Sequence, residues 1–539
     1  MESDLVSASK KNNMGLVLAG LLLGILMASM DNTIVSTAIG DIVGKLGGLD
    51  KFVWVTSAYM VAEMAGMPIF GKLSDMYGRK RFFVFGIIVF MLGSALCGTA
   101  TSIVQLSIYR AIQGIGGGAL VPIAFTIMFD AVPAESRGKL GGLFGAVFGL
   151  SSIFGPLLGA YLTEYAAWEW VFYINLPLGL IAFVFIAFFY KESRQHQRQQ
   201  IDWTGAVTLI GGVVCLMFGL ELGGKTFAWD SWQIMLLLGG FVVLTAAFLL
   251  AELRAKEPII SFRMFRKQIY WSSNVIAIFS GAAFVTASLY IPIFIQGVLG
   301  GKATNSGLVL LPMMVGSVLT ASTGGFLMNK LKYRTIMLPT LALLVVGLAL
   351  LTTLGEDTGL WTVRAFMILV GLGIGASFSV LSNAAMFSVS PRDRGTASST
   401  LNFLRSLGMT LGITVFGIIQ SHLFSRKMEA LAGSATDAPG SAGGAGDAAA
   451  GAAGTAGAAG GGLPPGLDLS DPHTLLSPET RSQIPHQLLE SITSALSSSI
   501  VHTFAWAVIP AALALVTAFF MGRDKLEPEQ EQGEYSAMH

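Results

Sequence analysis

The chain of 539 residues is 53% hydrophobic and only 12% charged, with a mean hydropathy of +0.67, which excludes a soluble globular protein and indicates a polytopic membrane protein. The formal net charge is +1 and the basic residues are spread over short loops, so nucleic-acid binding is not expected. Cys97 and Cys215 both lie inside apolar runs, so neither a disulfide framework nor a metal site is predicted.

Fourteen apolar runs are each long enough to cross a membrane core of ~30 Å as a helix. No small-residue cleavage site follows the polar residues 1–13, so we expect the first run to remain as a span. The sequence therefore predicts an all-α membrane protein with fourteen transmembrane helices. The runs lie near residues 14–39, 52–71, 82–100, 104–128, 140–162, 170–190, 203–222, 231–251, 271–298, 305–328, 335–354, 362–388, 397–421 and 500–521.

The distribution of basic residues predicts the orientation of these spans. Most of the 33 lysines and arginines fall in loops on one side if both termini are cytoplasmic, which is the side that such residues prefer. Arg110 and Arg405 fall within spans. We therefore expect a multi-pass protein of the cell (cytoplasmic) membrane with both termini cytoplasmic.

Two acidic residues in the first spans are candidates for chemistry, because ionisable groups are costly in a bilayer. Asp31 lies in the outer half of the first span and Glu63 near the middle of the second, while Arg110 lies at a depth similar to that of Asp31. Burial and a neighbouring guanidinium act in opposite directions on a carboxyl, which allows it to take and release a proton. Two alternatives stay open: a static Asp31–Arg110 ion pair, and a Glu63 that is permanently protonated and hydrogen-bonded.

A charged stretch between two glycines, residues 71–81, separates the second and third runs. Gly71 and Gly78 permit close approach and unusual backbone angles, Asp75 suits a helix N-terminus, and Arg79 favours the cytoplasmic side. The stretch predicts a tight hairpin between helices at a membrane face. An ordinary basic turn is the alternative.

The chain contains an internal duplication. A variant of the 71–81 stretch returns at 325–334, the glycine run 114–118 returns at 371–375, and Arg137-Gly138 returns as Arg394-Gly395 at nearly the same separation. Two apolar runs between 191 and 269 have no counterpart in either half. We therefore expect two pseudo-symmetric six-helix bundles with an inserted helix pair. The predicted divisions are 1–190 for the first bundle, 191–269 for the linker with two extra helices, 270–522 for the second bundle including an extracellular loop at 422–499, and 523–539 for a cytoplasmic tail.

The outer loop has two parts. Residues 432–462 are nearly all alanine and glycine and predict a mobile tether, either an unselective spacer or a partner site. Residues 484–499 have the apolar spacing of a short surface helix. Residues 219–226 match the nucleotide-loop pattern G-x-x-x-x-G-K-T, but they end a membrane helix on the outer face, so ATP binding is not predicted.

The 71–81 stretch, G-x-L-x-D-x-x-G-R-K-R, resembles the signature loop of the major facilitator superfamily. Arg110, Gln113, Gly114 and Gly116 resemble the fourth-helix motif that this family ties to proton transfer. The resemblance thus implies a proton-coupling set of Asp31, Glu63, Arg110 and Gln113, and a cytoplasmic gate motif of Gly71, Asp75, Gly78 and Arg79.

Gly149, Gly155, Pro156 and Gly159 in the fifth span resemble the antiporter motif associated with exporters. Proline removes a backbone hydrogen bond, and the glycines let the helix lie tight against a neighbour. Outside residues 430–499, nearly the whole chain resembles the fourteen-span drug:proton antiporters. The chain departs from the family pattern at Ser151, Ala160, Gly40 and Glu169.

The resemblance implies a secondary transporter that exports amphipathic or cationic drugs by alternating access, and not an enzyme. It implies no cofactor beyond the proton gradient, and a monomer in membrane lipid whose partners are small-molecule substrates and protons. Trp54, Tyr59, Phe148 and Asn175 are the residues expected at the substrate cavity. The main alternative is a dedicated exporter of one metabolite, lipid or antibiotic; a membrane enzyme or sensor and an importer are weaker ones.

Overall fold

The chain is helical throughout the part that the computed structural model describes, and that part contains no strand. The predicted all-α class is confirmed. The described residues are 2–47, 53–132, 134–192, 202–224, 226–255, 257–301, 308–328, 330–436 and 486–522. The helices are α1 (Glu2–Leu46), α2 (Val53–Tyr77), α3 (Arg79–Cys97), α4 (Ile103–Ala131), α5 (Ala134–Tyr165), α6 (Trp170–Tyr173), α7 (Asn175–Val184), η2 (Phe185–Phe189), α8 (Trp203–Leu222), α9 (Trp232–Arg254), η3 (Met264–Arg266), α10 (Gln268–Ile293), η4 (Phe294–Val298), α12 (Leu310–Leu327), α13 (Tyr333–Leu351), α14 (Leu360–Phe387), η5 (Pro391–Asp393), α15 (Arg394–Thr436) and α17 (His486–Phe519).

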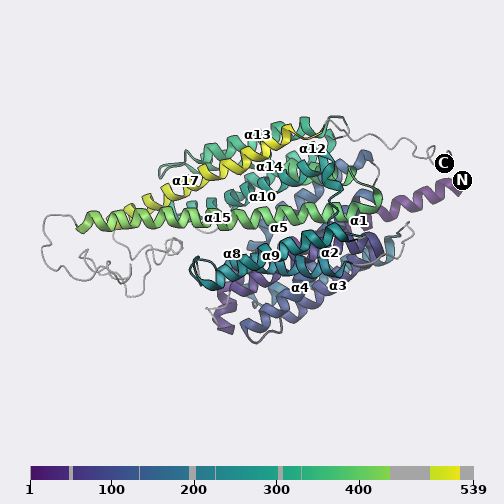
Figure 1. Ribbon diagram of the computed structural model, residues 1–539, viewed down its shortest axis with the longest axis horizontal. Coiled ribbons are helices and arrows are strands. Elements are labelled where there is room, and N and C mark those ends of the chain that lie inside the picture. The colour runs from purple at the N-terminus through teal and green to yellow at the C-terminus, as the bar shows by residue number, and fades with distance from the viewer. Residues whose placement is uncertain are drawn as a thin grey trace.

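Thirteen helical segments of the described chain are long and apolar enough to cross a membrane. The remaining predicted span is α2, which carries Glu63, Lys72 and Asp75 and lies against α4. With α2 included, these segments account for the fourteen predicted spans, the sixth being made of α6, α7 and η2 in succession. Helix α1 begins and α17 ends at the same end of the molecule (Figure 1), as an even number of crossings requires.

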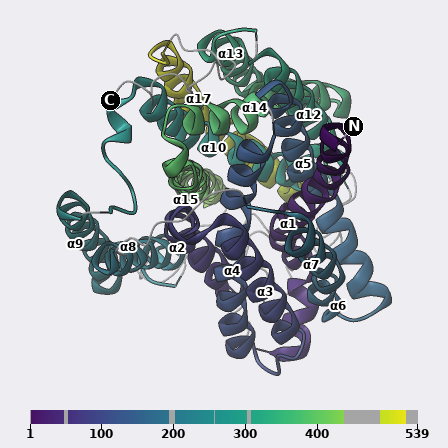
Figure 2. The same ribbon diagram turned by 90° about the vertical axis from the view of Figure 1, so that its right-hand side faces the viewer.

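The helices form two bundles with an extra pair at one side (Figure 2). In the first bundle α4 packs against α2 and α3, and α1 packs against α5; in the second, α14 packs against α12 and α13, and α10 against α15. The two bundles meet mainly where α5 contacts α12 and where α2 contacts α15. The inserted helices α8 and α9 pack against each other, and α8 also contacts α2.

Glycines set the close packing in both bundles. A Cβ on Gly114 would collide with the Tyr59 carbonyl of α2, whereas one on Gly116 would collide with the backbone of α3. The repeat has the same arrangement, because Gly371 of α14 meets the backbone of α12 and Gly373 meets that of α13. Small residues let helix backbones approach where lipid supplies no hydrophobic force between helices. The glycine runs therefore fix α4 and α14 between two neighbours each.

Helices α15 and α17 extend together beyond the other helices at one end (Figure 1). The prediction of a separate surface helix at 484–499 is wrong, because α17 runs without a break from His486 to Phe519. The apolar residues of this part face the protein, because Ile492 and Leu496 are buried in the second bundle. Gln420 of α15 also donates a hydrogen bond of 3.2 Å to Ser499 of α17. The apolar face thus packs on protein instead of lying on a membrane surface.

Residues 432–436 of the predicted tether belong to α15, which runs to Thr436, so the prediction is wrong there. The rest of the tether, 437–462, and the tail at 523–539 lie outside the described residues. The exact divisions at 190/191 and 269/270 remain predictions.

Candidate functional site

Asp31, Arg110 and Gln113 meet inside the first bundle. Asp31 forms an ion pair with Arg110, and both side chains are fully buried. Gln113 and Asn175 donate hydrogen bonds of 2.8 and 3.0 Å to Asp31 Oδ1, and each also donates one to Ser94 Oγ. Arg110 also donates to Gln113 Oε1 over 2.7 Å. A buried ion pair is stable only with such additional partners, so this set, named the polar cluster here, joins α1, α3, α4 and α7.

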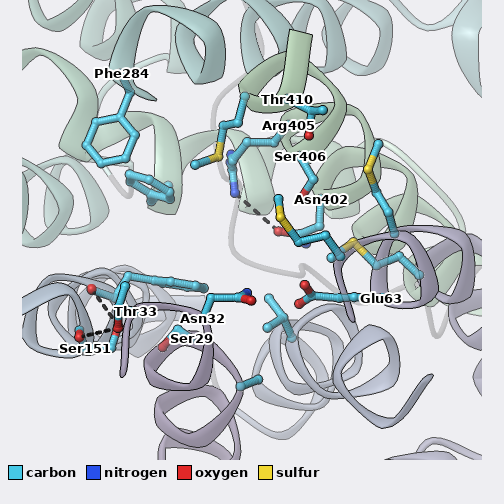
Figure 3. Close-up of a pocket in the computed structure, with 18 of the residues that line it drawn as sticks. Ser29, Asn32, Thr33, Glu63, Ser151, Phe284, Asn402, Arg405, Ser406 and Thr410 are labelled. Atoms are coloured by element: carbon cyan, nitrogen blue, oxygen red, sulfur yellow. Dashed lines mark hydrogen bonds between the residues drawn. The ribbon is translucent and has the colours of Figure 1, made fainter. Parts of the chain in front are cut away.

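A cavity of about 290 Å³ lies between the two bundles (Figure 3). Its volume is close to the lower end of small-molecule sites, about 300 Å³. Glu63 and Arg405 are the ionisable residues among those that line it. The other lining residues are Ala28, Ser29, Asn32, Thr33, Met60, Met64, Met67, Val121, Phe148, Gly149, Ser151, Phe284, Met314, Ser317, Phe378, Asn402, Ser406, Met409, Thr410 and Ile413.

Neighbouring residues of α1 connect the polar cluster with the cavity. Asp31 points into the cluster, whereas Asn32 points into the cavity toward Glu63 (Figure 3). The Oδ1 atom of Asn32 is buried and has no hydrogen-bond partner among the described residues. Glu63 thus faces a cavity in this structure, and Asp31 is closed off from it.

Of the four predicted cavity residues, Phe148 lines the cavity and three do not. The Tyr59 ring is buried and covers Arg110, whose guanidinium carbon is 4.2 Å from the ring centroid. Trp54 packs against Phe218 of α8, with ring centroids 4.8 Å apart. Asn175 belongs to the polar cluster. The prediction was based on residue type and on depth in the membrane. These helices are apolar on all sides, so neither property shows which face of a helix meets the cavity.

The residues of the predicted gate motif join the two bundles at one end, which we name the motif face. Gly71 lies so close to α15 that a Cβ would collide with Ser399. Gly78 has φ of 115°, in the region that favours glycine, and directly precedes α3. Asp75 accepts hydrogen bonds from the backbone amides of Gly395 and Thr396 over 2.8 and 2.7 Å. The carboxylate therefore caps the N-terminus of α15, a helix of the other bundle.

Arg79 and Arg394 share one carboxylate at this face. Arg79 forms an ion pair with Asp130 at the end of α4, and Arg394 of α15 donates to the same carboxylate over 2.7 Å. Arg79 also donates to Asp75 over 3.3 Å and to the Pro391 carbonyl over 3.2 Å. Asp75, Arg79, Asp130 and Arg394, named the clasp here, therefore hold the two bundles together at the motif face.

A second group of charges lies at the rim of the clasp. Glu257, three residues after α9, accepts hydrogen bonds of 3.0 Å from Lys72 of α2 and from Arg392 of η5. The segment that follows the inserted pair thus bridges both bundles.

The glycines of the predicted antiporter motif face two different neighbours of α5. A Cβ on Gly155 would collide with Thr33 of α1, and one on Gly159 with Thr37 of the same helix. Gly149 faces Met314 of α12, across the boundary between the bundles. Pro156 lies inside α5. The motif therefore lets α5 lie close to α1 while its other side contacts the second bundle.

The chain matches the Major Facilitator Superfamily over residues 21–413, more than half of its length. It belongs to this superfamily. Multidrug resistance protein 3 of Bacillus subtilis (strain 168) is 49% identical over 525 residues, which cover 97% of this chain and 98% of the relative. Multidrug transporter protein MdtP of the same strain is 38% identical over 412 residues, 76% of each chain. Efflux pump dotC of Dothistroma septosporum is 32% identical over 423 residues, 77% of this chain and 72% of the relative.

Solved structures of superfamily transporters share the fold. The human organic anion transporter MFSD10 (TETRAN) has a TM-score of 0.56 at 14% identity, over 93% of this chain and 99% of that one. The proton:xylose symporter XylE has a TM-score of 0.53 at 14% identity, over 76% and 89%. Identities this low show the superfamily fold alone.

Within this superfamily fold, the residues of the site that sequence reasoning missed include Asn32, Asp130, Glu257 and Arg405. Arg405 carried a usable signal, since it is a charge inside a predicted span. Asp130 and Glu257 lie at or just beyond helix ends, where carboxylates are common, and Asn32 is uncharged. Among the described residues, no group of three or more His, Cys, Asp or Glu side chains could hold a metal ion.

Proposed function

We propose that the protein exports amphipathic, mainly cationic drugs across the cytoplasmic membrane in exchange for protons. The cavity is the observation that carries this proposal, because Glu63 is the one carboxylate among its lining residues and lies amid phenylalanine and methionine side chains. A carboxylate attracts a lipophilic cation, while aromatic and thioether groups adapt to substrates of different shape. The relatives named as a multidrug resistance protein, a multidrug transporter and an efflux pump support the same function.

The transport cycle alternates access to this cavity from the two sides of the membrane. The clasp joins the bundles at the motif face in the present conformation. The excess of basic residues at that face supports a cytoplasmic position for it and for both termini. Breaking the clasp would admit substrate from the cytoplasm, and re-forming it would accompany release outside.

Glu63 is the group that exchanges a proton for the substrate. The carboxylate holds the cation while deprotonated, and a proton arriving from the outer side neutralises it and releases the cation. Asp31 is coupled to this step through α1, because its neighbour Asn32 faces Glu63 (Figure 3). Arg110 and Gln113 hold Asp31 in place. The protein acts as a monomer and draws its energy from the proton gradient, without a bound cofactor.

Ethidium efflux from proteoliposomes under an imposed pH gradient tests the proposal. We expect Glu63→Gln to abolish gradient-driven efflux, because a neutral amide neither exchanges a proton nor attracts the cation. Asp31→Asn should reduce it strongly. Glu164→Gln makes the same chemical change at the exposed end of α5 and is the matched control.

Three results would contradict parts of the proposal. Efflux by wild-type protein that ignores the pH gradient would remove proton coupling. Gradient-driven efflux at the control rate in both carboxylate variants would remove the assigned proton sites. Failure of unrelated dyes to compete with ethidium would favour the dedicated exporter of a single compound.

A further inference from the structure

The cavity contains two ionisable side chains of opposite charge, and they come from different bundles. Glu63 projects from α2 of the first bundle and Arg405 from α15 of the second (Figure 3). No ion pair joins them, so the carboxylate oxygens and guanidinium nitrogens are more than 4.0 Å apart. The proposed function uses Glu63 and leaves Arg405 without a role.

Arg405 differs from the other buried arginines of the described chain. Arg79, Arg110 and Arg394 each pair with an aspartate. Arg405 is 7% exposed, and its partners are neutral: the Asn402 side-chain oxygen at 3.3 Å and the Ser377 carbonyl at 3.0 Å. Burying a guanidinium without a counter-ion is costly. The site therefore has an unmet preference for an anion.

The internal repeat shows that the positive charge of Arg405 is not a feature common to the two bundles. Arg137 corresponds to Arg394 in the duplication. The same number of residues after each of them stands Phe148 in the first bundle and Arg405 in the second, so these two positions correspond as well. Both of these residues line the cavity. The first bundle thus presents an apolar ring where the second presents a cation.

The carboxylate of the cavity, Glu63, likewise has no acidic counterpart in the other bundle. Gly118 of α4 lies against the Glu63 carbonyl, and Gly375 of α14 lies in the same way against the Ser317 carbonyl. Glu63 therefore corresponds to Ser317, another lining residue. The cavity combines an acid from one bundle with a base from the other, and no lining residue neutralises either.

Aromatic rings lie beside the base. The Phe148 and Phe378 rings stack with centroids 5.9 Å apart, and the Arg405 guanidinium carbon is 4.9 Å from the centroid of Phe378. Phe284 meets Phe378 edge to face, again at 5.9 Å. A flat ring that packed on this surface would place an attached acidic group within reach of Arg405.

We propose that Arg405 binds the carboxylate of those aromatic cations that also carry one, so that the cavity holds an aromatic zwitterion more tightly than the same ring with a cation alone. This deepens the proposed export function and rests on it. The substrate carboxylate pairs with the guanidinium of Arg405, its ammonium group faces Glu63, and its ring packs on Phe148 and Phe378. A guanidinium suits a carboxylate because it donates hydrogen bonds in a planar, two-pronged arrangement.

Two matched probes test this assignment: 2-naphthylalanine and its decarboxylated amine. Equilibrium binding to the purified full-length protein gives the ratio of amine Kd to zwitterion Kd, and competition with ethidium efflux gives the same ratio during transport. In the wild type we expect the zwitterion to bind at least about tenfold more tightly than the amine. Arg405→Gln should bring the ratio close to one, Arg405→Lys should restore part of it, and Arg364→Gln, on the outer side of α14, should leave it unchanged.

The ratio separates selectivity from stability, because a variant that is merely damaged loses affinity for both compounds alike. Equal binding of zwitterion and amine by the wild type would overturn the proposal. So would a ratio that Arg405→Gln leaves intact. Binding selectivity without any ethidium efflux would support the role of Arg405 and contradict the proposed export of cations.

Discussion

Replacing Asp75 by asparagine should open the motif face. The carboxylate offers two oxygens to the α15 terminus, one for the amide of Gly395 and one for that of Thr396. An asparagine side chain keeps a single acceptor, so one amide loses its partner. Hydrogen bonds to charged groups contribute about 1.5–3 kcal/mol, and a negative charge at a helix N-terminus contributes up to about 1 kcal/mol. The closed state should therefore lose about 3 kcal/mol, roughly a 100-fold shift in the equilibrium.

Distances between spin labels measure this shift. Arg81 at the start of α3 and Lys332 just before α13 are exposed and belong to different bundles at the motif face, so cysteines there report their separation. The background should lack Cys97 and Cys215. Asp393→Asn is the matched control, because this residue lies close to the same contact but accepts its hydrogen bond from Ser390, the residue directly before its own short helix η5.

We expect a single short distance for wild type and the control, and a second, longer distance that dominates in Asp75→Asn. A distance distribution that is the same in all three proteins would refute the reasoning that this carboxylate holds the closed state.

Three further predictions concern packing and charge. Gly371→Ala should lower the melting temperature, since the added methyl collides with the backbone of α12 at a cost of about 1–3 kcal/mol, whereas Gly239→Ala, with no atom within 4 Å, should not; equal melting temperatures would contradict the packing argument. Arg110→Gln should destabilise the protein by about 3–5 kcal/mol because it leaves Asp31 buried and unpaired, and adding Asp31→Asn should recover part of this; a double variant less stable than the single one would count against it. Glu257→Gln should change the relative populations of the short and long label distances only a few-fold, because Arg392, its partner in the second bundle, is exposed and such a pair contributes less than about 1 kcal/mol; a population shift as large as that of Asp75→Asn would be inconsistent with a weak rim.

The sequence predicted the number and order of the spans because hydropathy is a property of local composition. It also predicted that Asp31 and Arg110 are close, since depth in a membrane follows from counting residues at a fixed rise per residue. The pair indeed meets, although two helices separate it in the chain. Rotation about the helix axis was not predictable. Tyr59 and Met60 are adjacent in α2, yet the first is buried against Arg110 and the second lines the cavity.

Contacts between the two bundles could not be predicted from the sequence either. The 71–81 stretch was recognisable as a turn, but nothing local showed that Asp75 would cap a helix more than 300 residues later in the chain. Asp130 likewise became part of the clasp only through the folding of α4 beside α15. The last span illustrates the reverse case: the apolar spacing of residues 484–499 was read correctly as a helix, and the partner of its apolar face was not.

The charged residues of the clasp are buried and those of the rim are more exposed, so the motif face has a strong centre and a weak rim. The Asp75 and Arg79 side chains are only 4% and 5% exposed, so water screens their contacts little. Arg392 at the rim is 56% exposed and its pairing with Glu257 is correspondingly weak. Because Glu257 follows α9, the inserted pair reaches the motif face through this weak contact, through the packing of α8 on α2, and through Ile259 and Ile260, which are buried in one apolar cluster with residues of α2 and with Phe403 of α15. The buried charges of the clasp therefore contribute more to closure of the motif face than the rim does, and a substrate or proton that opens this face has to break these contacts as well as the packing of α2 against α15.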